Sequence, residues 1–216
     1  IISILLKKHP DIICLQEVFL KSNAHILQER FSQKGFKHFF KFKDLLIISR
    51  QPFLFSVGKE FMSQGSFLSF AALDVLYGKG FQVIGIKTKM GDFVIVNTHL
   101  LSAYAFSAPR YQSVRENQVR EICAYLKTKG GDVPIVLVGD FNFQPYTKPY
   151  RTIGDFTFHD CSQSVLRTTK RKKLDYIFSS RINSHEIVVR GQFTALSDHS
   201  FLEANLPSYA SGIHFL

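Results

Sequence analysis

The chain has 216 residues, of which 45% are hydrophobic and 20% are charged, and its formal net charge is +10. This balance excludes a disordered chain, a collagen and a coiled coil, and the length suits one domain over residues 1–216. Three scattered cysteines, Cys14, Cys123 and Cys161, are too few for a disulfide scaffold and are expected to be free thiols. No apolar run is long enough to cross a membrane.

The chain begins with a short amphipathic pattern that leads into an apolar strand. Residues Ile1–Lys8 predict the end of a helix, His9–Pro10 breaks it, and Ile12–Leu15 predicts a buried strand. A helix that feeds a buried strand is the second half of a βαβ unit. The sequence therefore predicts that the N-terminal strand of the unit is missing from this chain.

The elements that follow are mostly short strands. A helix is expected from an N-cap at Ser22 to Lys34, and a longer one over Arg110–Lys129 ends at two glycines. A glycine-rich turn at 77–80 predicts a hairpin. The expected strands are Asp44–Arg50, Leu68–Val75, Phe81–Lys87, Phe93–Thr98, Pro134–Val138, Leu174–Phe178, Glu186–Arg190 and Phe201–Leu206. Many strands and few helices favour an α/β (α+β) fold, a mainly antiparallel sheet sandwich with helices outside it.

Polar side chains follow several of these strands at the point where each one ends. The candidates are Glu17, Asn97, His99, Asp140, Asn142, Asp175, Asp198 and His199. Each has an ordinary structural explanation when taken alone, such as a turn, a cap or a loop carboxylate. Together they indicate a site, because strand ends converge on one rim of a sandwich.

The residue types indicate metal-assisted chemistry. Glu17, Asp140, Asn142 and Asp198 offer the hard oxygen ligands that suit Mg²⁺ or Mn²⁺. His99 and His199 can move protons near neutral pH, and a carboxylate such as Asp175 can fix the tautomer of a histidine. This combination, without an obvious covalent nucleophile, favours metal-assisted hydrolysis of a phosphoester.

Five sequence blocks resemble the endonuclease/exonuclease/phosphatase superfamily, in the order found there. That group includes deoxyribonucleases, AP endonucleases, inositol-polyphosphate 5-phosphatases, deadenylases and neutral sphingomyelinases. The blocks span most of the chain and are Asp11-Ile-Ile-Cys-Leu-Gln-Glu17, Asn97-Thr-His-Leu100, Gly139-Asp-Phe-Asn142, Leu174-Asp-Tyr-Ile177 and Ser197-Asp-His199. The resemblance implies a four-layered α/β/β/α sandwich of the deoxyribonuclease/sphingomyelinase type.

The resemblance also implies roles for the site residues. Glu17 is similar to the family's metal-binding glutamate, and Asp198 to a further carboxylate on the metal side. His99 resembles the histidine that contacts the scissile phosphate, while Asp140 and Asn142 resemble the pair that holds the phosphate and the attacking water. His199 resembles the general base, oriented by Asp175.

The chain departs from the family pattern at its start. The family places an asparagine on its first strand near the metal, and this chain has no asparagine before Asn23. The missing strand predicted above accounts for this, and it leaves an inactive truncated binding module as one alternative for the chain.

A second resemblance bears on the substrate. Tyr104, Tyr111, Arg115, Gln118 and Glu121 recur at a spacing similar to that of neutral sphingomyelinases, in which a tyrosine-containing loop leads into an Arg-x-x-Gln-x-x-Glu helix. This resemblance implies cleavage of sphingomyelin to ceramide and phosphocholine, with a phospholipid at a membrane surface as substrate partner.

Charge and aromatic content are compatible with this substrate. The apolar loop around Tyr104–Phe106 is a candidate for contact with lipid, and the basic run Lys170–Lys173 for contact with anionic headgroups. The net positive charge equally suits nucleic acid, so a deoxyribonuclease-type endonuclease is the main alternative. No protein partner is evident, and a monomer is expected.

Overall fold

The computed structural model describes residues 2–65, 78–88, 91–102, 108–128, 132–182, 187–194, 197–206 and 214–215. Its helices are α1 (Ile2–Leu6), α2 (Lys21–Ser32), α4 (Ala108–Thr128) and α5 (Lys148–Asp155). Its strands are β1 (Ile12–Leu15), β2 (His38–Phe42), β3 (Leu45–Ser49), β4 (Phe53–Glu60), β5 (Gly80–Thr88), β6 (Gly91–His99), β7 (Ile135–Asp140), β8 (His159–Asp160), β9 (Asp175–Ser180), β10 (Val188–Gln192), β11 (Phe201–Asn205) and β12 (His214–Phe215).

The strands form one large sheet and two smaller ones. The large sheet has the order β4-β5-β6-β7-β9-β8, and the smaller sheets have the orders β1-β3-β2 and β10-β11-β12. Strands β6 and β7 are parallel, whereas the other pairs are antiparallel. The expected mainly antiparallel arrangement is therefore confirmed.

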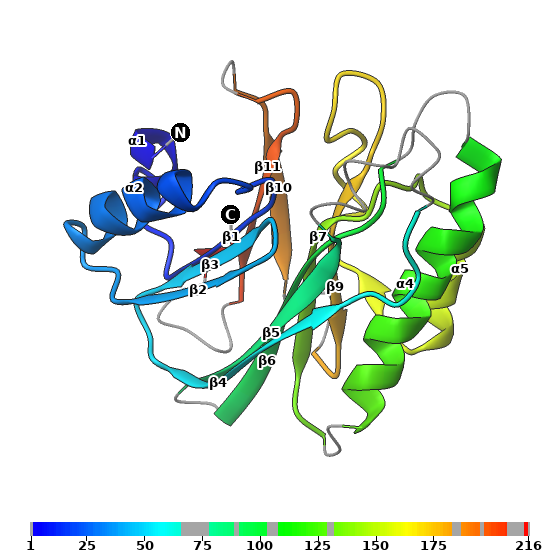
Figure 1. Ribbon diagram of the computed structural model, residues 1–216, viewed down its shortest axis with the longest axis horizontal. Coiled ribbons are helices and arrows are strands. Elements are labelled where there is room, and N and C mark those ends of the chain that lie inside the picture. Colours follow the sequence, from blue (N-terminus) through cyan, green and yellow to red (C-terminus); the bar gives the residue numbers. More distant parts are fainter. Residues whose placement is uncertain are drawn as a thin grey trace.

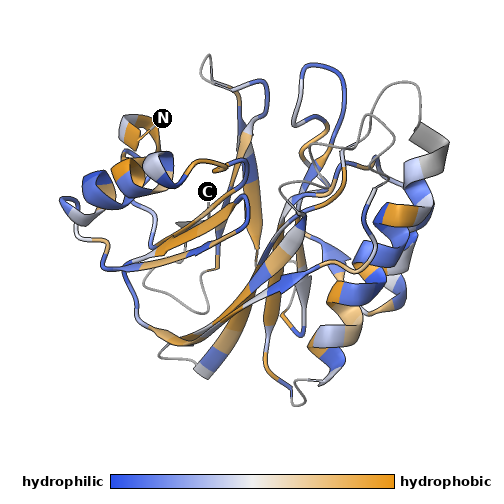
Figure 2. Ribbon diagram, viewed as in Figure 1, coloured by the Kyte–Doolittle hydropathy of each residue, from blue (hydrophilic) through white to orange (hydrophobic). Residues whose placement is uncertain are grey.

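The elements stack in four layers (Figure 1). Helices α1 and α2 pack on the β1-β3-β2 sheet through Leu5, Phe31 and Ile48, among others. The smaller sheets face the large sheet across an apolar core that includes Ile47, Ile95 and Leu202. Helices α4 and α5 cover the other face of the large sheet, and the strands between the layers are mostly hydrophobic (Figure 2). This is the expected α/β/β/α sandwich.

Most of the expected elements are present, and five that the sequence analysis did not predict are added. The additions are strands β2, β4, β8 and β12 and helix α5. Strand β5 pairs with β4 and β6, while the proposed hairpin partner over 68–75 lies outside the described residues. None of the described helices is long and apolar enough to span a membrane. The three cysteines are free, as expected.

The predicted N-cap at Ser22 is wrong. Helix α2 begins at Lys21, and its cap residue is Leu20, which has an extended backbone and makes no side-chain capping bond. The helix start is set by tertiary contacts of the preceding turn, where the Val18 N–H donates to the Asp44 carbonyl. Packing of that turn thus outweighs the capping preference of a serine.

The register of the large sheet determines where the polar strand ends meet. Glu60 pairs with Gly80, Gly80 with His99, His99 with Asp140, and Asp140 with Asp175. These residues form one row across four strand pairs at one end of the sheet. We call this end, with the loops that leave it, the catalytic end.

Gly139 is required for the close approach of β7 to β6 beside Asp140. Its φ is +142°, and a Cβ placed there would lie 1.9 Å from the Thr98 carbonyl oxygen. We expect Gly139→Ala to lower the free energy of unfolding by about 3 kcal/mol or more. Urea denaturation followed by circular dichroism measures this change.

Gly154 is the matched control for that substitution. It lies in α5, and a Cβ there would have no neighbour within 4 Å. Gly154→Ala is expected to be neutral or stabilising by up to about 1 kcal/mol. Equal stability of the two variants would show that the tight β6–β7 contact is not essential.

Candidate active site

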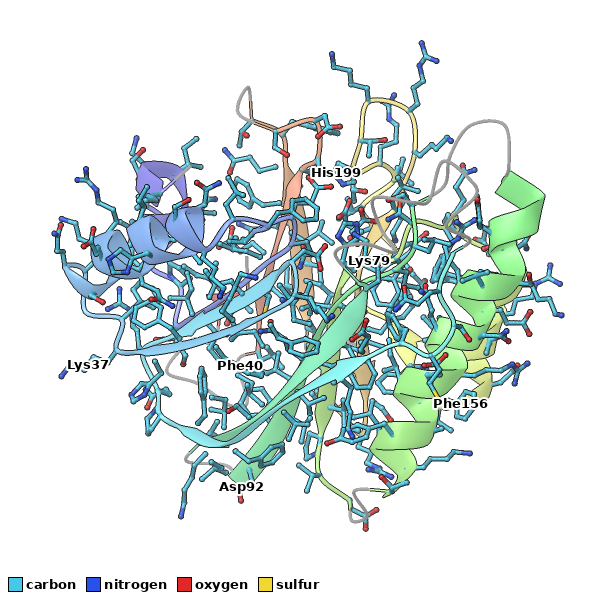
Figure 3. The ribbon with its side chains drawn as sticks, viewed as in Figure 1. Lys37, Phe40, Lys79, Asp92, Phe156 and His199 are labelled. Atoms are coloured by element: carbon cyan, nitrogen blue, oxygen red, sulfur yellow. The ribbon has the colours of Figure 1, made fainter. Side chains whose placement is uncertain are left out.

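Five of the seven residues to which the resemblance assigns a role line one cavity at the catalytic end. The cavity has a volume of about 230 Å³ and lies between β1, β7, β9 and the segment before β11. Its polar lining includes Glu17, Asp140, Asp175, Asp198 and His199. Figure 3 places the labelled His199 near this end of the sheets, with Asp92 at the opposite end. Strand ends that are distant in sequence thus converge as expected.

Asp175 and His199 are joined by a hydrogen bond. The distance from His199 Nδ1 to Asp175 Oδ2 is 2.8 Å, and 28% of the His199 side chain is exposed. This hydrogen bond, against the opposing effect of burial, raises the pKa of His199 to about 9, and the charges of Asp175, Asp140 and Asp198 add to the shift. The bond also fixes the ring so that Nε2 is the nitrogen left for other contacts.

A neighbouring loop holds both members of this pair in place. Thr169 forms a β-bridge with His199, and the Ser200 N–H donates to the Thr168 carbonyl. The Thr168 hydroxyl oxygen also accepts the backbone N–H of Asp175. The loop between β8 and β9 therefore contacts the chain on both sides of the pair.

Asp140 completes a group of three potential metal ligands. One ligand atom each from Asp140, Asp175 and His199 lies within 4.8 Å of the others. Burial and the charge of Asp175 raise the pKa of Asp140 to about 6, although His99 and His199 oppose the shift. Two carboxylates at this separation repel each other, and a divalent cation relieves that repulsion.

Asn142 supports Asp140 from the turn after β7. It has a φ of +51°, its backbone N–H donates to Asp140 Oδ1 at 2.8 Å, and its side-chain amide donates to the Leu100 carbonyl. Asn142 is 8% exposed and is not among the residues that line the cavity. In this structure its contacts fix the Asp140 carboxylate and the end of β6.

His99 is also buried behind the cavity. It is 2% exposed, and its Nε2 atom lies 3.6 Å from Asp140 Oδ2. Its Nδ1 atom lies 2.7 Å from Asp44 Oδ2, and the Lys79 ammonium lies 2.9 Å from the same Nδ1. His99 thus connects the cavity residue Asp140 to a buried ion pair.

The sequence analysis missed that ion pair. Lys79 Nζ donates to Asp44 Oδ2 at 2.9 Å, and both side chains are 1% exposed. Burial opposes ionisation of Asp44, but the hydrogen bond and charge of His99 and the charge of Lys79 hold its pKa below the usual value. Asp44 begins the strand predicted over Asp44–Arg50 and Lys79 lies in the glycine-rich turn, and neither position by itself indicates a buried ion pair.

Glu17 and Asp198 line the cavity but do not belong to the group of three. Both are exposed, and Glu17 has a positive φ of 61°, so the chain turns sharply as it leaves β1. Their metal-binding roles stay predictions.

The Arg-x-x-Gln-x-x-Glu face of α4 holds the loops beside the site. Gln118 accepts the Leu101 N–H and donates to the Ser63 carbonyl, while Glu121 accepts the N–H groups of Met62 and Ser63. This face therefore joins the segment after β6 to the segment after β4. Most of the predicted aromatic loop around Tyr104 lies in 103–107, outside the described residues.

The donor set fits a divalent cation. Carboxylate oxygens such as those of Asp140, Glu17 and Asp198 are typical ligands of Mg²⁺ or Mn²⁺, whereas His199, which is bonded to Asp175, is left for proton transfer. The described residues hold no cluster of cysteine and histidine that would suit zinc. Next to Mg²⁺ or Mn²⁺, a histidine fixed by a carboxylate can accept a proton from water. The arrangement is thus suited to hydrolysis.

Comparisons with solved structures show a similar fold in three proteins of different names and ligands. A mutant of Staphylococcus aureus beta toxin with bound magnesium ions superposes with a TM-score of 0.70 at 17% identity, over 90% of this chain and 86% of that chain. Sphingomyelinase C from Streptomyces griseocarneus gives 0.63 at 16%, over 92% and 84%. D. rerio TDP2, complexed with a single-strand DNA product, gives 0.69 at 18%, over 93% and 87%.

Sequence comparison identifies the family. A search of curated protein sequences gave no significant match. The family model described as "Endonuclease/Exonuclease/phosphatase family" matches residues 1–199 of the 216. Because this match covers most of the chain, the chain belongs to the endonuclease/exonuclease/phosphatase family.

Proposed function

We propose that the protein is a divalent-metal-dependent phosphodiesterase that cleaves a phospholipid in the manner of a sphingomyelinase. The observation that carries the proposal is the group of Asp140, Asp175 and His199 at one cavity. The helix face of Arg115, Gln118 and Glu121, similar to that of neutral sphingomyelinases, supports the lipid substrate.

The site residues have two roles in this proposal, metal binding and proton transfer. Asp140, with Glu17 and Asp198 at the cavity lining, would hold Mg²⁺ or Mn²⁺, which when bound supplies stabilisation of the negative charge that develops on the phosphate. His199 accepts the proton of the attacking water, and Asp175 keeps its ring in the required orientation. His99 and Asn142 position the Asp140 carboxylate from behind.

The pKa of His199 gives this assignment a test. In the metal-free chain the His199 ring should titrate at about pH 9, and because a general base acts in its neutral form, turnover should rise with pH as this ring loses its proton. Asp175→Asn removes the hydrogen-bonding carboxylate that raises this pKa, so the rise should move to lower pH. The pH profile of kcat/KM and an NMR titration of the His199 ring measure the shift. A profile that does not move would exclude His199 as the base.

The substrate is tested by assaying lipid and nucleic acid in parallel. Mg²⁺-dependent release of phosphocholine from sphingomyelin in mixed micelles is expected, with no nicking of supercoiled plasmid. Nicking without lipid cleavage would favour the deoxyribonuclease-type alternative, which the net charge of +10 also suits. Metal binding by calorimetry with neither activity would favour a binding module.

A further inference from the structure

The catalytic end carries an unusual share of exposed apolar side chains. Among the described residues, nine large hydrophobic side chains are exposed, and five of them lie on the loops at this end. These five are Leu20, Met62, Tyr146, Leu166 and Phe193. Their presence on the loops of the end that carries the cavity makes this end the candidate surface for contact with an apolar partner.

Two of the five belong to segments that carry residues of the site. Phe193 comes directly after β10 and directly before Thr194, which lines the cavity. Leu166 is 82% exposed and belongs to the loop between β8 and β9, which bridges to His199 through Thr169. An object that covers both segments would therefore lie at the catalytic end, beside the cavity.

The same loop presents three cations in a fixed turn. The N–H groups of Thr168 and Thr169 donate to the Lys172 carbonyl, and the N–H of Lys172 donates to the Thr169 hydroxyl. These bonds close a tight turn from which Lys170, Arg171 and Lys172 are exposed. The turn is fastened to the site by the bridge between Thr169 and His199.

Lys173, the fourth residue of the basic run, is not one of the exposed cations. Lys173 is 5% exposed, and its ammonium donates to Asp160 Oδ2 and to the Ser162 carbonyl. The prediction that this lysine contacts headgroups is therefore wrong, because it forms a buried ion pair. The basic surface is limited to the three preceding residues, with Arg167 also exposed nearby.

We propose that these loops form a membrane-binding surface that places the cavity mouth against a bilayer containing anionic lipid. Leu166 and Phe193 enter the headgroup region, and the turn Lys170–Lys172 contacts the anionic headgroups. A bilayer can take up apolar side chains such as Leu166 and Phe193 together with the basic turn, whereas duplex nucleic acid is bound mainly through phosphate contacts and offers no apolar interior. The inference rests on the proposed function, in which the substrate lies in a bilayer.

Vesicle co-sedimentation in EDTA tests this surface without requiring turnover. The probe is a vesicle of phosphatidylcholine and sphingomyelin with or without phosphatidylserine. Leu166→Asp and Phe193→Asp are each expected to weaken binding by roughly 10-fold or more, because each removes one buried apolar side chain from the interface. Val188→Asp is the matched control: Val188 and Phe193 are both 53% exposed, but Val188 lies at the opposite end of β10. It should bind like wild type.

Charge reversal tests the basic turn separately. The triple variant Lys170→Glu, Arg171→Glu, Lys172→Glu should lose roughly 100-fold or more in affinity for vesicles with phosphatidylserine, and little for vesicles without it. Hydrolysis of a soluble phosphodiester, bis(p-nitrophenyl) phosphate, should be unchanged in all of these variants. If that hydrolysis is absent in wild type while vesicle binding behaves as expected, the proposed function fails and the surface stands.

Two results would overturn the membrane-binding surface. One is binding of Leu166→Asp and Phe193→Asp to vesicles that equals that of Val188→Asp. The other is a chain that binds plasmid and does not bind vesicles, either as wild type or as any variant. In that case the triple charge variant would lose plasmid binding, and Leu166→Asp and Phe193→Asp would keep it. The second result would assign the basic turn to nucleic acid.

Discussion

Replacing His199 with alanine should lower phosphodiester turnover by roughly 10²–10⁴-fold, the contribution typical of a positioned general base. The fold should change little, because the ring is partly exposed and its main side-chain bond is to Asp175. Single-turnover kinetics and the thermal midpoint measure the two quantities.

The matched control is His25→Ala on α2. This ring is 71% exposed and pairs with Glu29 on the same helix, away from the cavity. Its removal should leave turnover unchanged. If His199→Ala retained the rate of His25→Ala, proton transfer would have to be assigned to another group.

Replacing Asp140 with asparagine should have an effect of similar size through a different cause. The side chain keeps its shape and can still accept the Asn142 N–H, but the charge that binds a cation is lost. Turnover should fall by roughly 10²–10³-fold, as when one charge-stabilising group of an active site is removed. Binding of Mn²⁺, followed by calorimetry, should weaken in parallel.

Asp155→Asn separates this effect from a general change in charge. Asp155 is exposed at the end of α5, far in sequence from the cavity residues. It should keep wild-type turnover and Mn²⁺ affinity. Unaltered Mn²⁺ binding by Asp140→Asn would remove Asp140 from the metal site.

The backbone of the site could be predicted because its residues follow strong local patterns. The apolar strands that end in Glu17, His99 and Asp140 have few alternatives, since such runs must be buried. The pairing of Asp175 with His199 followed from the family resemblance of two short blocks. These features depend mainly on local sequence, so they could be predicted before the structure was known.

The features that escaped prediction depend on distant partners. Asp44 and Lys79 are 35 residues apart, and their pairing depends on sheet contacts that place both beside His99 at the end of β6. Lys173 was predicted to belong to an exposed basic run, but it forms a buried ion pair with Asp160 on β8. A buried ion pair of this kind needs both partners and their desolvation, and neither is visible in a local pattern.

Hydrolysis of bis(p-nitrophenyl) phosphate during titration with Mg²⁺ and then EDTA tests the central claim most directly. We expect turnover that saturates with Mg²⁺, that EDTA abolishes, and that Asp140→Asn lacks. A rate that persists in EDTA, or one that Asp140→Asn retains in full, would contradict a metal-dependent phosphodiesterase at this cavity.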